Sequence, residues 1–160
     1  MSSGLADYRN LLPRGDADAL HIELADGAIL VSGRYALIMI REGEVIDSAM
    51  WYEVQSARWE GEKQELSVNW VDPARPPLVV HSSHSPMRPF MEDISEKVNR
   101  TQVLVRSVKA PSGAVITAQI RKREDGELFS VLAARGRLDD EAVELAHSLE
   151  KQLRESVGLE

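Results

Sequence analysis

The residue types best suited to chemistry gather in one short stretch, His81-Ser82-Ser83-His84. Two histidines could supply two of the three or four ligands that a zinc ion needs. The remaining ligands would have to come from Asp72, Glu92 or Asp93. A polar loop ahead of a helix explains the same residues without a metal. We therefore expect no metal site and keep His81 and His84 as the candidates for one.

The serines of this stretch also suggest a nucleophile beside a base. Such pairs assemble across a fold rather than between neighbours in sequence. The chain has no Gly-x-Ser-x-Gly elbow, no Walker lysine loop and no Gly-x-Gly-x-x-Gly motif. The carboxylate pairs Glu92-Asp93 and Asp139-Asp140 fall at expected helix starts, where capping explains them. We expect no enzyme and no cofactor, with a hydrolase around His81 and His84 as a remote alternative.

A second candidate site is a group of basic residues late in the chain: Arg121, Lys122, Arg123, Arg135 and Arg137. Such charges could bind an anion, a ligand or a nucleic-acid backbone. Binding of single-stranded nucleic acid also requires exposed aromatic side chains, and the only one nearby, Phe129, is expected to face the core. Arginines on a sheet edge also discourage aggregation, and we favour this structural role. Binding at residues 121–137 stays the alternative, and nucleic acid is not the expected partner.

Charge is unevenly distributed over the 160 residues. Residues 1–99 hold 9 Lys/Arg and 16 Asp/Glu, residues 100–137 hold 8 and 3, and residues 138–160 hold 2 and 7. Docking of the basic segment on acidic ones is the favoured explanation. The chain has no cysteine, no apolar run of about 20 residues and no signal-like start, so we expect a cytoplasmic protein that does not enter a membrane.

The pattern between Ala28 and Val71 predicts short strands joined by tight turns, and three tryptophans punctuate it. Seven strands are expected over these ranges: 19–25, 29–32, 35–40, 45–50, 55–59, 64–71 and 78–80. A helix from Pro89 to Arg100 should follow, with Phe90, Ile94 and Val98 on one stripe. Before them, residues 1–13 should form a short helical arm.

The last third of the chain predicts three further strands, at residues 102–108, 115–121 and 128–133. A final helix is expected to start at Asp139 or Asp140 and to end at Gly158. Its apolar face should cover a sheet, formed by its own strands or by a partner. These residues (102–160) are expected to form a three-stranded meander plus helix, packed on the preceding domain or on a second chain.

Five segments carry a likeness to a known family: 26–31, 53–59, 66–70, 94–98 and 126–131. With them the chain resembles a bacterial pleckstrin-homology-like (PH-like) domain. More narrowly, it is similar to a family of uncharacterised actinobacterial proteins that brings no known activity. The resemblance implies an α+β fold: a PH-like antiparallel β-barrel capped by a helix over residues 14–101, with a C-terminal βββα extension.

One segment departs from the phosphoinositide-binding members of that family. They hold an anionic headgroup with basic residues in the first hairpin, whereas this hairpin, at residues 23–27, is acidic. Lipid binding is therefore not expected. The function predicted from sequence is a non-enzymatic binding or assembly module that acts through protein–protein contacts with an unidentified partner and forms a homodimer.

Overall fold

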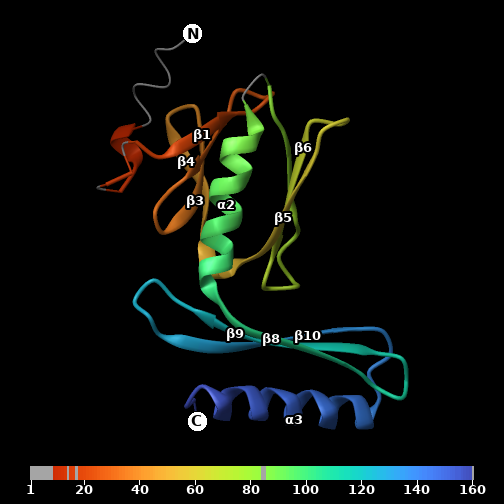
Figure 1. Cartoon of the computed structure of the whole chain (residues 1–160). Helices are drawn as coiled ribbons and strands as arrows, with labels where there is room; N and C mark the ends of the chain where they lie inside the picture. The colour runs from red at the N-terminus through yellow and green to blue at the C-terminus, as the bar shows by residue number, and fades with distance from the viewer. Residues whose placement is uncertain (1–8, 14, 17, 84–85, 160) are drawn as a thin grey trace. The chain divides into compact units, whose positions relative to one another are not determined.

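The computed structural model describes residues 9–13, 15–16, 18–83 and 86–159, and these form an α+β protein of mostly antiparallel sheets with two α-helices (Figure 1). The chain divides into two compact units, residues 1–99 and 100–160. Of the predicted helical arm, the described part is a 3₁₀ turn, η1 (Arg9–Leu11); residues 1–8 lie outside the described range.

The first sheet of the first unit has four antiparallel strands in the order β1-β2-β3-β4. Their bounds are β1 Leu20–Glu23, β2 Ile29–Ser32, β3 Ala36–Arg41 and β4 Glu44–Met50. Turns with Gly27 and Gly43 at positive φ join the first and last pairs, as the Asp-Gly and Glu-Gly-Glu sequences predict. A 3₁₀ turn, η2 (Trp51–Glu53), follows and buries the Trp51 ring.

The second sheet of this unit has three antiparallel strands in the order β5-β6-β7. Their bounds are β5 Val54–Glu60, β6 Glu65–Trp70 and β7 Leu78–His81. The three prolines before β7 lie in a loop, where they remove no ladder hydrogen bond. In this order β7 and β5 are the two edges of the sheet.

The helix α2 (Met87–Thr101) packs its predicted stripe against both sheets (Figure 1). Phe90, Ile94 and Val98 are buried with core residues of both sheets, such as Leu30 and Leu66. Burial of these side chains supplies the main driving force for holding the helix in place. The predicted stripe is confirmed as the buried face of α2.

The described residues of the first unit form two separate sheets and no closed barrel, so the predicted PH-like barrel is not confirmed. One isolated bridge, Leu24 with Ser82, joins β1 to the segment after β7. Elsewhere along β7, the neighbouring residues of the first sheet contribute side chains rather than a paired strand. The physical reason is that a cavity separates β7 from the β1–β2 turn and the end of β3, so the backbones of the two sheets do not pair along most of this strand.

The second unit is a three-stranded antiparallel sheet in the order β10-β9-β8, with α3 across one face (Figure 1). Its elements are β8 Gln102–Lys109, β9 Val115–Lys122, β10 Leu128–Arg135 and α3 Asp140–Ser156. Asp139 caps α3 by accepting a hydrogen bond from the Ala142 N–H at 2.9 Å, as predicted. The side chains of Ile116, Ile120 and Leu153 form the centre of a core separate from that of the first unit.

None of the described helices combines the length and the apolar composition needed to cross a membrane.

Candidate functional site

The outer edge of β7 is one of the strand edges of the first unit, and it lies beside a cavity. The Ser82 N–H donates to the Gln64 carbonyl at 3.0 Å, whereas the His81 carbonyl accepts from the Ala25 N–H at 2.8 Å on the opposite side. Backbone groups alternate in direction along an antiparallel strand, so the N–H and C=O of Val79 point away from β6, like those of His81. The Val79 side chain is 51% exposed. Val79 therefore has an N–H and a C=O that the ladder with β6 does not use.

A cavity of about 290 Å³ opens beside this edge. Its walls are β7, the end of β1 with its turn, and the end of β3. It is lined by Leu24, Ala25, Asp26, Met39, Arg41, Leu78, Val79, Val80 and His81. The lining is apolar in its centre and carries charged groups at one end. A cavity of this kind fits a large apolar side chain together with part of its backbone.

Both ends of this opening are closed by contacts between the sheets. At one end, the Ser83 N–H donates to the Glu23 carbonyl at 3.0 Å, next to the Leu24–Ser82 bridge. At the other end, Arg75 Nη2 lies 2.9 Å from Asp47 Oδ1, and the Arg75 guanidinium stacks over the Trp70 ring. The opening is therefore a bounded window about as long as β7, roughly 13 Å.

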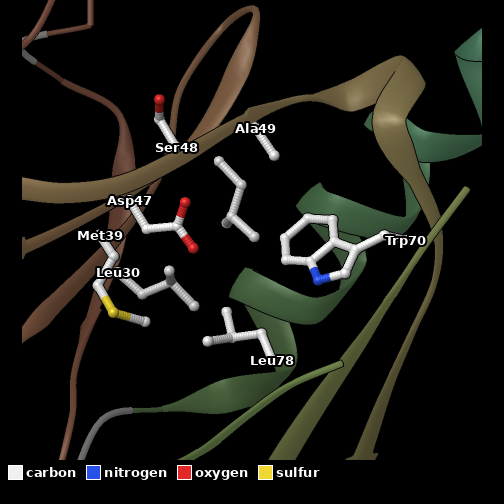
Figure 2. A pocket seen from close by; sticks show the side chains of 8 residues that line it. Leu30, Met39, Asp47, Ser48, Ala49, Trp70 and Leu78 are labelled. Carbon is white, nitrogen blue, oxygen red and sulfur yellow. The ribbon is translucent and has the colours of Figure 1, made fainter. Parts of the chain in front are cut away.

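A much smaller hollow of about 10 Å³ lies at the Asp47 end. Figure 2 shows the side chains of Leu30, Asp47, Trp70 and Leu78 directed toward this space. Met39 and Leu78 line both the hollow and the larger cavity. A volume of this size holds no more than about one water molecule. The larger cavity is thus the part of the window that a ligand can enter.

The charged end of the cavity is built on Asp26. Its Oδ1 accepts a hydrogen bond from the Ala28 N–H at 3.0 Å, and its Oδ2 pairs with Arg41 Nη2. The Ala28 N–H and the Arg41 guanidinium hold the pKa of Asp26 below its usual value. Asp26 is therefore a carboxylate at neutral pH, and its pairing with Arg41 fixes the position of both side chains at the cavity mouth.

The predicted metal candidates do not form a cluster in the described residues. His81 Nε2 lies 3.3 Å from Glu65 Oε2, and His84 is outside the described range. Asp93 instead accepts hydrogen bonds from Ser32 Oγ and Lys97 Nζ, at 2.5 and 2.8 Å. Among the residues that the structure describes, no three His, Asp or Glu side chains converge as metal ligands do.

The predicted basic group is divided between the two ends of the β9–β10 hairpin. Arg121 pairs with Phe129 in the ladder, whereas Arg135 pairs with Val115. Six residues of β10 separate these positions, which is about 20 Å. Lys122, Arg135 and Arg137 are exposed and Arg123 is half-buried. The register therefore does not bring the five residues into one anion site.

Arg121 and Phe129 differ most from their expected environments. Arg121 is fully buried, donating to Gln119 Oε1 at 3.0 Å and Thr101 Oγ1 at 2.7 Å. Burial lowers its pKa to about 10. Phe129, expected to face the core, is half-buried beneath the Arg123 guanidinium instead. Its ladder position puts it on the opposite sheet side from Ile120, which packs under α3.

Sequence reasoning did not identify the edge of β7 or the cavity beside it. The three prolines before β7 could have indicated an edge strand, because proline within sheets is confined to edge strands and loops. The first hairpin was recognised as acidic, yet the residues that meet across the window are too far apart in sequence for spacing to connect them. No protein-family model matches the chain, and no curated protein matches it.

Proposed function

We propose that the chain is a non-enzymatic binding module with a PH-like fold, and that it binds an extended polypeptide segment as an added strand along β7. Support for the fold comes from the order of its elements: four antiparallel strands, then three, then a helix packed against both sheets. Support for a role without catalysis comes from the window itself, which combines apolar walls with an ion pair.

One observation carries the binding proposal: the outward N–H and C=O of Val79 stand beside a cavity large enough for an apolar side chain. In strand addition, main-chain hydrogen bonds give affinity and pockets for alternate side chains give specificity. The window supplies both within the length of β7. Its two closed ends limit the ligand to a short segment.

The test replaces single residues of β7 with proline. Because the Val79 N–H makes no ladder bond to β6, Val79→Pro should leave the fold intact while blocking an added strand. Selection of displayed random peptides of about ten residues should enrich binders on the wild-type chain. Their affinity for Val79→Pro should be at least about tenfold lower.

Val80→Pro is the matched folding control, because Val80 pairs with Leu66 inside the ladder and its N–H is needed there. This variant should lower the melting temperature, whereas Val79→Pro should change it little. Peptides that bind wild-type and Val79→Pro equally would overturn the proposal, as would the absence of any enriched peptide.

Homodimer formation stays a prediction. Val103 and Val105 of β8 are 45% and 48% exposed, and β8 is an edge of its sheet. Sedimentation equilibrium of the wild-type chain at high concentration tests this prediction.

A further inference from the structure

Three hairpin turns of the first unit, β1–β2, β3–β4 and β5–β6, lie at the same end as the cavity. Ile29 pairs with both Glu23 and Ile40, which places the β1–β2 turn beside the β3–β4 turn. The β5–β6 turn joins them, because Gln64 accepts the Ser82 N–H next to the Leu24–Ser82 bridge. Residues 24–26 and Arg41 line the cavity, and the remaining residues of these turns, 42–44 and 60–65, lie at the same end of the two sheets.

These turns give this end of the first unit a strongly negative charge. They contain seven carboxylates and two basic residues, Arg41 and Lys63. The carboxylates are Glu23, Asp26, Glu42, Glu44, Glu60, Glu62 and Glu65. All seven except Glu65 are exposed. We call them the acidic rim.

The basic groups at this end already have acidic neighbours. Arg41 pairs with Asp26, Lys63 Nζ lies 3.8 Å from Glu60 Oε2, and His81 lies beside Glu65. The three turns together still carry an excess of carboxylates beside the cavity. A cluster of exposed charges of one sign raises the local concentration of oppositely charged ligands near it.

From this charge we infer that the polypeptide bound along β7 is basic: an extended segment whose large apolar residue enters the cavity and whose flanking Lys or Arg residues lie against the acidic rim. This inference rests on the proposed strand addition and names the chemistry of its partner. The alternating geometry of a strand fits it, since successive side chains point to opposite faces. An anionic segment would be repelled by the carboxylates of the acidic rim.

The experiment compares the peptides enriched on the wild-type chain by net charge. The enriched sequences should carry Lys or Arg around a bulky apolar residue. Synthetic versions should bind about tenfold more weakly at high salt than at low salt, because the charges on both sides are exposed. Replacing the basic residues of a binding peptide with Glu should abolish binding.

Charge-reversal variants of the protein provide the matched comparison. The double variant Glu44→Lys/Glu62→Lys changes the acidic rim, while Glu124→Lys/Glu127→Lys makes the same charge change in the turn between β9 and β10. Only the first should weaken the basic peptides, by at least about tenfold. Equal effects of the two double variants would overturn the inference.

The outcomes separate this inference from the function on which it rests. Neutral or acidic peptides that bind wild-type but not Val79→Pro would overturn the basic partner and leave strand addition standing. Peptides insensitive to Val79→Pro would overturn strand addition itself. Self-association of the wild-type chain that Val79→Pro abolishes would put a second copy on β7 and overturn the inferred partner.

Discussion

At the scale of single residues, Asp26 links the turn between β1 and β2 to the end of β3. It accepts the Ala28 N–H and pairs with Arg41, and both contacts favour the ionised carboxylate. A group whose pKa is lowered on folding contributes stability above its unfolded pKa. That contribution is lost as the pH falls through the lower, folded pKa.

The first prediction concerns Asp26→Asn. At pH 7 this variant should be less stable than wild type by about 0.2–1 kcal/mol, the range of an exposed ion pair. The difference should shrink below about pH 4 as the wild-type carboxyl becomes protonated. Urea unfolding of both proteins between pH 7 and pH 2 measures it. A difference that persists undiminished at pH 2 would contradict the role of the charge.

Gly33 lies where the loop between β2 and β3 meets residues from elsewhere in the chain. A Cβ atom at this position would stand 2.7 Å from Asp16 Oδ2 and 2.8 Å from the Ala36 carbonyl oxygen. The Gly33 carbonyl also accepts a hydrogen bond from Trp51 Nε1 at 2.8 Å. The backbone here can move little without losing this bond.

The second prediction is that Gly33→Ala lowers the free energy of unfolding by about 1–3 kcal/mol through overpacking. Thermal unfolding followed by circular dichroism measures the loss. Gly61→Ala is the control, since its nearest contact would be Trp59 Nε1 at 3.8 Å. If both glycine variants lose the same stability, the close approach at Gly33 is not the cause.

At the scale of elements, α2 is attached to the first sheet by a polar cluster as well as by its apolar stripe. Lys97 Nζ donates to Ser32 O, Ser32 Oγ and Asp93 Oδ2 at 2.9, 3.0 and 2.8 Å. Ser32 is fully buried, and its Oγ donates to Asp93 at 2.5 Å. The cluster therefore fixes the axial position of the helix on β2.

The third prediction compares Lys97→Met with Arg88→Met on the same helix. Lys97→Met should cost about 1–3 kcal/mol, because it removes charge-assisted bonds from a largely buried group. Arg88→Met should cost less than about 0.5 kcal/mol, because Arg88 is 90% exposed in its pair with Glu92. Equilibrium urea unfolding measures the stability of the two variants. Equal losses in the free energy of unfolding would contradict the proposal that the polar cluster stabilises the helix on β2.

The positions of the helices and strands could largely be predicted from the sequence, while the joining of the sheets could not. Alternation and turn residues predicted β6 and β9, and the stripe Phe90, Ile94 and Val98 predicted the buried face of α2. The predicted PH-like barrel is not confirmed, because closure of a sheet depends on the hydrogen bonds available between edges that are distant in sequence. The periodicity of side chains within a strand carries no information about which other strand pairs with its edge.

The candidate site could be predicted even less, for the same physical reason. The cavity lies between Met39, Leu78 and the β1–β2 turn, which come from three distant parts of the sequence. A space between distant segments leaves no pattern within any one of them. Arg121 is a residue for which the sequence pattern suggested the wrong environment. Its place in a basic run suggested exposure, but its ladder position buries it against Gln119 and Thr101.

At the scale of the whole molecule, the core that α2 covers in the first unit is separate from the core of the second unit. Leu66 is fully buried in the core of the first unit, and Leu153 is 1% exposed in that of the second. All three tryptophans belong to the first unit, at positions 51, 59 and 70. Their fluorescence therefore reports on one core only.

The fourth prediction compares two variants that each create a cavity in one core, Leu66→Ala in the first unit and Leu153→Ala in the second. Each should lower the free energy of unfolding of its own unit by about 2–5 kcal/mol. Leu153→Ala should accelerate amide hydrogen exchange in β9 more than in β6. Leu66→Ala should accelerate exchange in β6 more than in β9. Leu66→Ala should also lower the midpoint of the unfolding transition that tryptophan fluorescence follows. Mass spectrometry of exchanged peptides measures both. Equal acceleration in β6 and β9 by either variant would show a single cooperative unit.

Two residues near the acidic rim adopt a backbone conformation that their side chains disfavour. Glu42 has a φ of 50° and Gln64 a φ of 51°, in the left-handed region. Glycine, asparagine and aspartate tolerate this region better. Across evolutionary relatives, position 64 should therefore drift toward asparagine or glycine. Position 42 should drift toward aspartate alone where a basic partner is selected, because aspartate tolerates this region and keeps the carboxylate. A lineage with glycine or asparagine at position 42 would therefore have lost that selection.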